Sequence, residues 1–176
     1  MLIISHRGNG FGFPENTVEA ACAAMDAGFL AEVDVWLRRG GAVISHDKPV
    51  GGEPMIDLLY SARSQDALIE HIKALRSFSV RRLGEKTLGE CDTAAEFHDL
   101  IDCGRGVVVT DDKEWLTAEM VQRAHAESWL PVLVAGHNIF QRNERRWLEL
   151  YRMGVDGIMT DVPLELRRFL YDRALA

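Results

Sequence analysis

The chain has 176 residues, enough for a buried core, and we expect residues 1–176 to form one domain. Its net charge of −7 excludes the basic surface that general nucleic-acid binding requires, but a bound metal ion would still permit a phosphorylated ligand. No segment approaches the roughly 20 apolar residues of a membrane span. The three cysteines form no CxxC pattern, which favours a reduced, cytoplasmic protein.

The N-terminal quarter of the chain alternates between apolar strands and one helix. Residues 2–5 predict a short buried strand. A helix is expected from about Asn16, because Asn16 and Glu19 resemble a capping box, and Gly28 suits its C-terminal end. Two further strands are expected, over 31–36 and over 42–45.

The rest of the chain continues this alternation, which predicts an α/β fold with parallel strands. Strands are expected over 78–83, 106–110, 131–135 and 157–160, helices over 65–75, 117–127, 144–153 and 163–171, and a helix-starting capping box over 93–96. A complete (β/α)8 barrel takes about 250 residues. We therefore expect a contracted or incomplete barrel of strands and helices.

Polar side chains gather where the predicted strands end. His6 and Arg7 follow the first strand, Glu32 and Asp34 lie in the second, and His46 follows the third. The carboxyl ends of parallel strands meet on one face of such a fold. We therefore expect two imidazoles, a guanidinium and two carboxylates to converge there.

Glu32 and Asp34 lie two residues apart on a strand, so their side chains point to the same side. Two carboxylates aimed together repel each other unless a cation lies between them, and oxygen ligands favour Mg²⁺ or Ca²⁺. The alternative is a pair of exposed strand carboxylates. The apolar neighbours on the opposite face, Val33 and Val35, argue against it.

Two imidazoles at one strand edge suit acid–base catalysis near pH 7. A single histidine after a buried strand is more often a core residue, but His6 and His46 together favour catalysis. Arg7 suits bidentate contact with a phosphate, or it pairs with Glu15 or Glu32. The histidines on predicted helices are read as structural or surface residues: His71, His98 and His125.

The order and spacing of these residues resemble the N-terminal signature of the glycerophosphodiester phosphodiesterase family. The resemblance rests on His6-Arg7-Gly8, Pro14-Glu15-Asn16-Thr17, Glu32-Val33-Asp34-Val35 and His46-Asp47. A later segment, 154–163, is similar to the last barrel strand of that family. The clear similarity covers about 1–47 and 117–165.

The resemblance implies a TIM barrel and a metal-dependent phosphodiester hydrolase that releases an alcohol and glycerol 3-phosphate. His6 and His46 would be the acid–base pair, and Arg7 would bind the phosphate of a small-molecule phosphodiester. The remaining roles concern the cation, Mg²⁺ or Ca²⁺: Glu32 and Asp34 would bind it, Glu15 would bind it or orient its ligands, and Asn16 would support the loop.

Two departures from the family, a missing acidic ligand and missing barrel segments, keep other functions open. The family has a further acidic ligand in a Glu-x-Lys motif that is missing here, and Asp111 or Asp112 is the candidate replacement. The alternatives are a non-catalytic or decayed protein that binds phosphate ligands, and a lyase that forms a cyclic phosphate. Because a barrel that lacks strands leaves exposed edges, the sequence also favours a homodimer.

Overall fold

A computed structural model describes residues 1–38, 41–44, 55–60, 81–83, 86–104, 106–109, 115–128 and 131–173. The strands are β1 (Leu2–Ser5), β2 (Leu30–Arg38), β3 (Gly41–Ile44), β4 (Met55–Tyr60), β5 (Arg81–Leu83), β6 (Lys86–Cys91), β7 (Gly106–Val109), β8 (Val132–Val134) and β9 (Gly157–Thr160). The helices are η1 (His6–Gly8), α1 (Val18–Asp26), α3 (Ala94–Asp102), α4 (Ala118–Ser128), α5 (His137–Phe140), α6 (Glu144–Met153) and α7 (Pro163–Asp172). Among these helices, none is long and apolar enough to cross a membrane.

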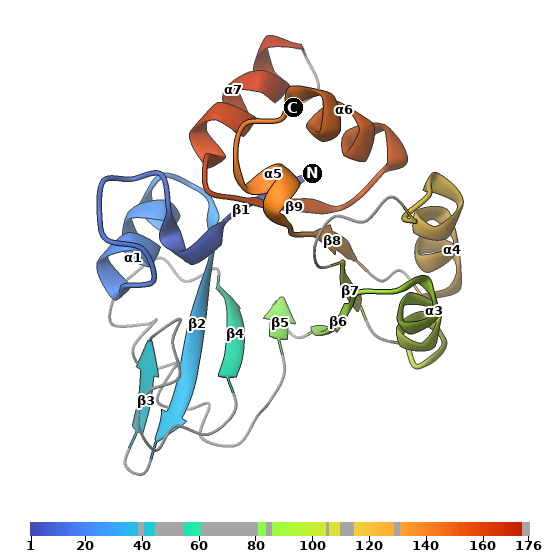
Figure 1. Cartoon of the computed structure of the whole chain (residues 1–176), viewed down its shortest axis with the longest axis horizontal. Helices are drawn as coiled ribbons and strands as arrows, with labels where there is room; N and C mark the ends of the chain where they lie inside the picture. Colours follow the sequence, from blue (N-terminus) through green and yellow to red (C-terminus); the bar gives the residue numbers. More distant parts are fainter. Residues whose placement is uncertain are drawn as a thin grey trace.

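The strands form one curled sheet in the order β3-β2-β1-β9-β8-β7-β6-β5. Strand β4 also pairs with β2, along the edge opposite to β3. From β2 to β6 along this order, neighbouring strands are parallel. Strands β3 and β4 are antiparallel to β2, and β5 is antiparallel to β6. The curl brings β4 and β5 side by side, while α1, α3, α4, α6 and α7 lie outside it (Figure 1). The contracted, TIM-barrel-like fold is confirmed, because antiparallel strands stand where a full barrel continues with βα units.

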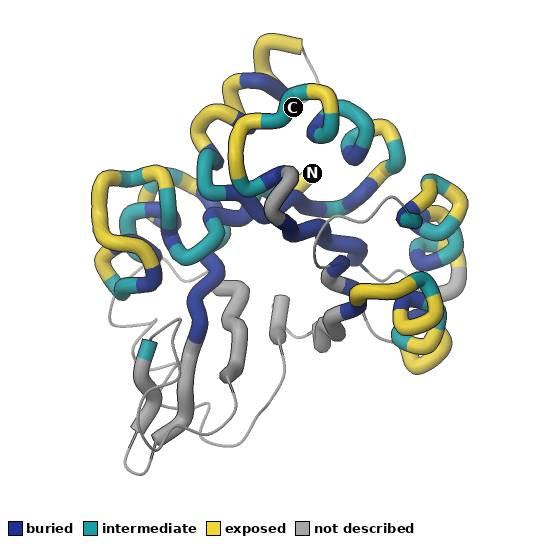
Figure 2. Tube along the Cα trace, in the orientation of Figure 1, coloured by how far each residue is buried: buried dark blue, intermediate teal, exposed yellow. Residues whose placement is uncertain are grey.

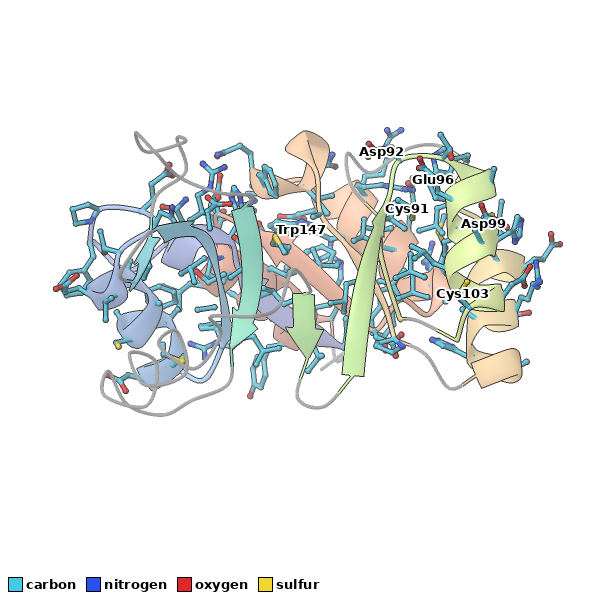
Figure 3. The ribbon with its side chains drawn as sticks, turned by 90° about the horizontal axis from the view of Figure 1, so that it is seen from below. Cys91, Asp92, Glu96, Asp99, Cys103 and Trp147 are labelled. Carbon is cyan, nitrogen blue, oxygen red and sulfur yellow. The ribbon has the colours of Figure 1, made fainter. Side chains whose placement is uncertain are left out.

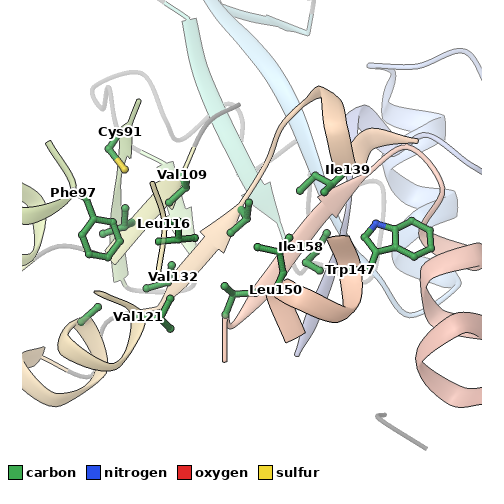
Figure 4. Packing of buried hydrophobic residues seen from close by; sticks show 14 of the residues in the cluster. Cys91, Phe97, Val109, Leu116, Val121, Val132, Ile139, Trp147, Leu150 and Ile158 are labelled. Atoms are coloured by element: carbon green, nitrogen blue, oxygen red, sulfur yellow. The ribbon is translucent and has the colours of Figure 1, made fainter. Parts of the chain in front are cut away.

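Side chains alternate between the two faces of the curled sheet, as the period of a strand requires. The outer face carries Val107, Val132 and Ile158, which pack in one cluster with Phe97 of α3 and Trp147 of α6 (Figure 4). The inner face carries a separate small cluster: Ile4, Leu133, Ala135 and Met159. Burial accordingly follows β9, β8 and the second half of β1, while the outer turns of the helices are exposed (Figure 2).

Of the two capping boxes predicted from the sequence, one is present in the structure and one is not. The capping box before α3 is confirmed, since Thr93 and Glu96 accept hydrogen bonds from each other's backbone N–H groups; Figure 3 shows Glu96 at the start of this helix beside Asp92. The capping box predicted for Asn16 and Glu19 is wrong. The N-cap of α1 is Thr17, whose hydroxyl accepts from the N–H of Ala20 at 3.2 Å.

The predictions over 2–5, 31–36, 117–127, 131–135, 144–153, 157–160 and 163–171 agree with the structure to within one or two residues. The described parts of the strands predicted over 42–45, 78–83 and 106–110 are also strands, and residues 45, 78–80 and 110 lie outside the described residues. The helix predicted over 65–75, with His71, lies outside the described residues. Four of the described elements were missed: η1, β4, β6 and α5. The segment of β6 mixes charged residues with a glycine, and α5 is only one turn long, so neither carries a readable period.

Candidate active site

The loop that follows β1 holds two residues in a backbone conformation that few residues adopt: Arg7 of η1 and Asn16. Arg7 has φ 53° and Asn16 has φ 56°, both in the left-handed region. A hydrogen bond of 2.7 Å from the N–H of Asn16 to the carbonyl of Arg7 ties the two together. Between them the loop is seated on α1, because a Cβ at Gly8 would lie 2.5 Å from the backbone of Ala20. Such strained positions concentrate at functional sites.

Each of these two residues also holds one acidic residue of β2. The backbone N–H of Arg7 donates to Oε2 of Glu32 at 3.1 Å, and Oδ1 of Asn16 accepts from the N–H of Asp34 at 2.9 Å. Glu32 is 2% exposed and Asp34 is 4% exposed. On the opposite face of the strand, Val33 packs against α1 in an apolar cluster. Two ionisable carboxyl groups therefore lie buried on one side of β2.

The side chain of Arg7 places a positive charge beside Asp34 and Glu15. Its Nη1 donates to Oε1 of Glu15 at 3.2 Å, and its Nε lies 3.1 Å from Oδ2 of Asp34. The second contact is close enough for an ion pair but is not aligned as a hydrogen bond, since both atoms are buried without a hydrogen-bond partner among the described residues. The pairing of Arg7 with Glu15 was one of the sequence-based alternatives. The carboxylate of Glu32 instead accepts a hydrogen bond from the backbone N–H of Arg7.

Glu15 lies at the exposed rim of the site. The side chain of Asn9 donates to Oε2 of Glu15 at 3.1 Å and also to Oδ1 of Asp161 at 3.0 Å. The hydrogen bond from Asn9, with the bond and the charge of Arg7, lowers the pKa of Glu15 against the opposing effect of burial. Asn9 thus links the carboxylate beside Arg7 to a second carboxylate, which lies after β9.

His6 is held on its edge and on its face. Its Nδ1 lies 2.7 Å from Oδ1 of Asp161, and its ring stacks on Phe140 with 4.0 Å between centroids and 6° between planes. Because a carboxylate only accepts, a neutral His6 must carry its proton on Nδ1, which leaves Nε2 as the basic atom. Burial opposes ionisation of Asp161, yet hydrogen bonds from His6 and Asn9 lower its pKa overall.

The pairing of β1 with β9 explains why Asp161 meets His6. Ser5 is paired with Thr160, so the residues that follow these two strands stand side by side. The carbonyl of Phe140 accepts from the hydroxyl of Thr160 and from the N–H of Asp161, both at 2.9 Å, which fixes α5 over the same edge.

The sequence analysis missed Asp161, Phe140 and Asn9. A readable signal existed for Asp161, which directly follows a predicted strand just as His6 does. Phe140 offered no such signal, since it ends a single-turn helix. His46 and Asp111, which the sequence analysis assigned to the same site, lie outside the described residues.

With this geometry in place, the chain can be compared with known proteins. It is similar to a solved glycerophosphoryl diester phosphodiesterase of Parabacteroides distasonis, with a TM-score of 0.62 and 14% identity over 98% of this chain and 86% of that one. The chain has a phosphodiesterase-like barrel fold. A solved glycerophosphodiester phosphodiesterase of the same organism gives a TM-score of 0.51 and 17% identity over 98% of both chains. At these identities the likeness is one of fold, and it agrees with the family resemblance of the sequence motifs. No family model matches the chain, and no curated protein matches it.

The acidic residues can be tested against the divalent cation that the resemblance implies. Among the described residues, no group of three or more His, Cys, Asp or Glu side chains could hold a metal ion. Mg²⁺, however, commonly takes only one or two carboxylates and completes its shell with water and substrate phosphate. Glu32 and Asp34 supply two carboxylates, and Oδ2 of Asp34 is buried without a hydrogen-bond partner among those residues. This donor set fits a hard divalent cation.

Proposed function

We propose that this chain is a metal-dependent phosphodiesterase that hydrolyses small glycerophosphodiesters to an alcohol and glycerol 3-phosphate. One observation carries the proposal: at a single strand edge, His6 is locked by Asp161 next to Arg7 and two buried carboxylates. A base such as His6, a guanidinium that binds phosphate and a pair of carboxylates that can bind a metal ion are the groups that phosphodiester hydrolysis needs. The fold similarity to two phosphodiesterases supports the same reaction class.

The contact between His6 and Asp161 supports a role for His6 in acid–base catalysis. With Nδ1 bonded to Asp161, Nε2 takes a proton from the attacking oxygen or returns one to the leaving alcohol. The attacking oxygen is that of water or of a hydroxyl group on the substrate glycerol. His46 is proposed as the second member of the acid–base pair, and its place lies outside the described residues.

The acidic residues would bind Mg²⁺ or Ca²⁺ through Glu32 and Asp34, with Glu15 as a further ligand or as an orienting group and Asp111 as the candidate replacement for the missing family ligand. When bound, the cation would offset the phosphate charge and polarise the bond that breaks. Asn16 supports the site by holding the backbone of Asp34. A cytoplasmic location and a homodimer joined through strand edges belong to the same proposal.

A second candidate function is binding of phosphate ligands without catalysis. The observation in its favour is that Arg7 already pairs with Glu15 and Asp34, so the described carboxylates have a counter-charge without any metal. A lyase that releases a cyclic phosphate would use the same site, and it differs only in whether water completes the reaction.

The test is turnover of glycerophosphocholine by chelated protein, before and after addition of Mg²⁺ or Ca²⁺, with products identified by phosphorus NMR. We expect cation-dependent release of glycerol 3-phosphate, and a fall of roughly 10²–10⁴-fold in kcat for His6→Ala. His98→Ala is the matched control, because this histidine pairs with Arg123 between α3 and α4. Absence of turnover with either cation favours the binding protein, and accumulation of a cyclic product favours the lyase.

A further inference from the structure

Three buried polar atoms around Asp34 have unused hydrogen-bonding capacity. They are Nε of Arg7, Nδ2 of Asn16 and Oδ2 of Asp34, each without a hydrogen-bond partner among the described residues. Buried polar groups are normally paired, because an unpaired one costs about 1–3 kcal/mol. A cluster of three in one place indicates that a ligand belongs there. The ion-pair contact of 3.1 Å between Arg7 and Asp34 is a poorly aligned substitute for it.

A divalent cation and the guanidinium of Arg7 compete for the same oxygen. A cation bound to Oδ2 of Asp34 would stand about 2.0–2.6 Å from that atom. Nε of Arg7 already lies 3.1 Å from it. Two positive groups on one buried oxygen repel each other, so we expect the guanidinium to move when the cation binds.

We propose that Arg7 is an exchangeable internal counter-ion, which a divalent cation displaces from Asp34 and which then binds the substrate phosphate. The inference rests on the proposed cation site. The backbone of Arg7 is fixed by its bonds to Glu32 and Asn16, so only the side chain moves. A freed guanidinium presents two parallel N–H groups, which match the oxygens of a phosphate.

The exchange couples the two ligands. A cation releases Arg7 for the phosphate, and the phosphate holds Arg7 away from the position that the cation needs. By thermodynamic linkage each ligand raises the affinity of the other by the same factor, typically about 5- to 150-fold. Substitution of Arg7 by an uncharged residue removes the competitor, so the cation alone should bind more tightly, while the phosphate should lose most of its effect.

The experiment is calorimetric titration of Mg²⁺ into chelated protein, with and without inorganic phosphate, for wild type, Arg7→Met and Arg7→Lys. We expect Arg7→Met to bind Mg²⁺ alone at least about fivefold more tightly than wild type, with a smaller enhancement by phosphate. Arg7→Lys keeps a competing charge but not the planar fork, so its affinity for Mg²⁺ alone should stay near wild type while the phosphate enhancement shrinks. The matched control is Arg142→Met, at an exposed arginine that pairs with Glu144.

The outcomes separate this inference from the proposed function. If wild type binds Mg²⁺ and Arg7→Met binds it equally or more weakly, the exchange is refuted while the cation site stands. If Arg7→Met does not fold, an unchanged phosphate enhancement in Arg7→Lys refutes the exchange in its place. If wild type binds no Mg²⁺ with or without phosphate, the cation site and the exchange both fail.

Discussion

The orientation of His6 depends on two contacts that come from different parts of the chain. Asp161 holds the ring at Nδ1, and Phe140 covers one face. Together they prevent the ring from turning and from exchanging its two nitrogen atoms. Loss of either contact should therefore affect proton transfer more than substrate binding.

We expect Phe140→Leu to lower kcat by about tenfold, less than the roughly 10²–10⁴-fold for loss of the proton donor or acceptor itself, while KM stays near wild type. Leucine fills similar space but cannot stack on the imidazole. Nitrogen NMR of the His6 ring should show a second tautomer in the variant, whereas Phe140→Tyr should restore the single tautomer. Equal changes in kcat and KM, with one tautomer in both variants, would contradict this role for the ring.

Asp161 also links the site to the pH dependence of stability. Its pKa is lower in the folded protein than in the unfolded chain, so the folded state binds fewer protons between the two values. The stabilising contribution of Asp161 is complete above the unfolded pKa and is lost as the pH falls through the folded pKa. We expect Asp161→Asn to be less stable than wild type in urea at pH 7, and the difference to narrow at pH 3. Asp99→Asn, at an exposed position of α3, is the control, and a constant difference at both pH values would be evidence against the claim.

At the scale of elements, α3 shows how a short local signal fixes a helix. Glu96 accepts from the N–H groups of Asp92 and Thr93, and the hydroxyl of Thr93 accepts in return. The helix carries Phe97, which is fully buried against the sheet. The capping hydrogen bonds span at most four residues, which is why the sequence alone predicted the capping box.

We expect Thr93→Ala to lower the free energy of unfolding by about 1 kcal/mol, because one helical N–H then loses its acceptor. Urea denaturation provides the measurement. Thr93→Ser retains a hydroxyl and should recover most of the loss. An alanine variant as stable as wild type would mean that water replaces the cap at no cost.

The Asn16 prediction failed for the opposite reason. Its side chain does not serve the helix that follows it, but the backbone of Asp34, 18 residues away. A capping pattern cannot reveal such a contact, because the competing partner lies on another element. Thr17, one residue later, was available as the N-cap instead.

At the scale of the whole molecule, the sequence predicted the parallel alternation and the contraction of the barrel, since both follow from element order and length. It also predicted that the acidic residues of β2 face one side, and the burial of Glu32 and Asp34 agrees with that geometry. To predict the contact between His6 and Asp161 from the sequence, one would need to know that β1 and β9 are neighbours. That adjacency depends on how the sheet curls, which no short pattern encodes.

The hydrophobic cluster on the outer face of the sheet stabilises several helices together. Trp147 is fully buried in a cluster that joins α3, α4, α6 and α7 to the sheet, and it packs edge-on against Phe169 at 5.6 Å. We expect Trp147→Ala to lower the free energy of unfolding by about 3–5 kcal/mol, through lost burial and a residual cavity. Chemical denaturation would measure it. The half-buried Trp115 gives the control, and equal losses at both positions would argue against a continuous core.

Because β1 pairs with β9, a growing polypeptide carries an unpaired β1 edge until most of the chain has left the ribosome. His6 and Asp161 are 155 residues apart, and synthesis at about 5–20 residues per second separates their emergence by about 8–30 seconds. During that interval the apolar edge is open to chaperones and to other nascent chains. A ribosome that stops before Asp161 releases a product in which His6 has no partner carboxylate, so premature termination removes the carboxylate that orients His6.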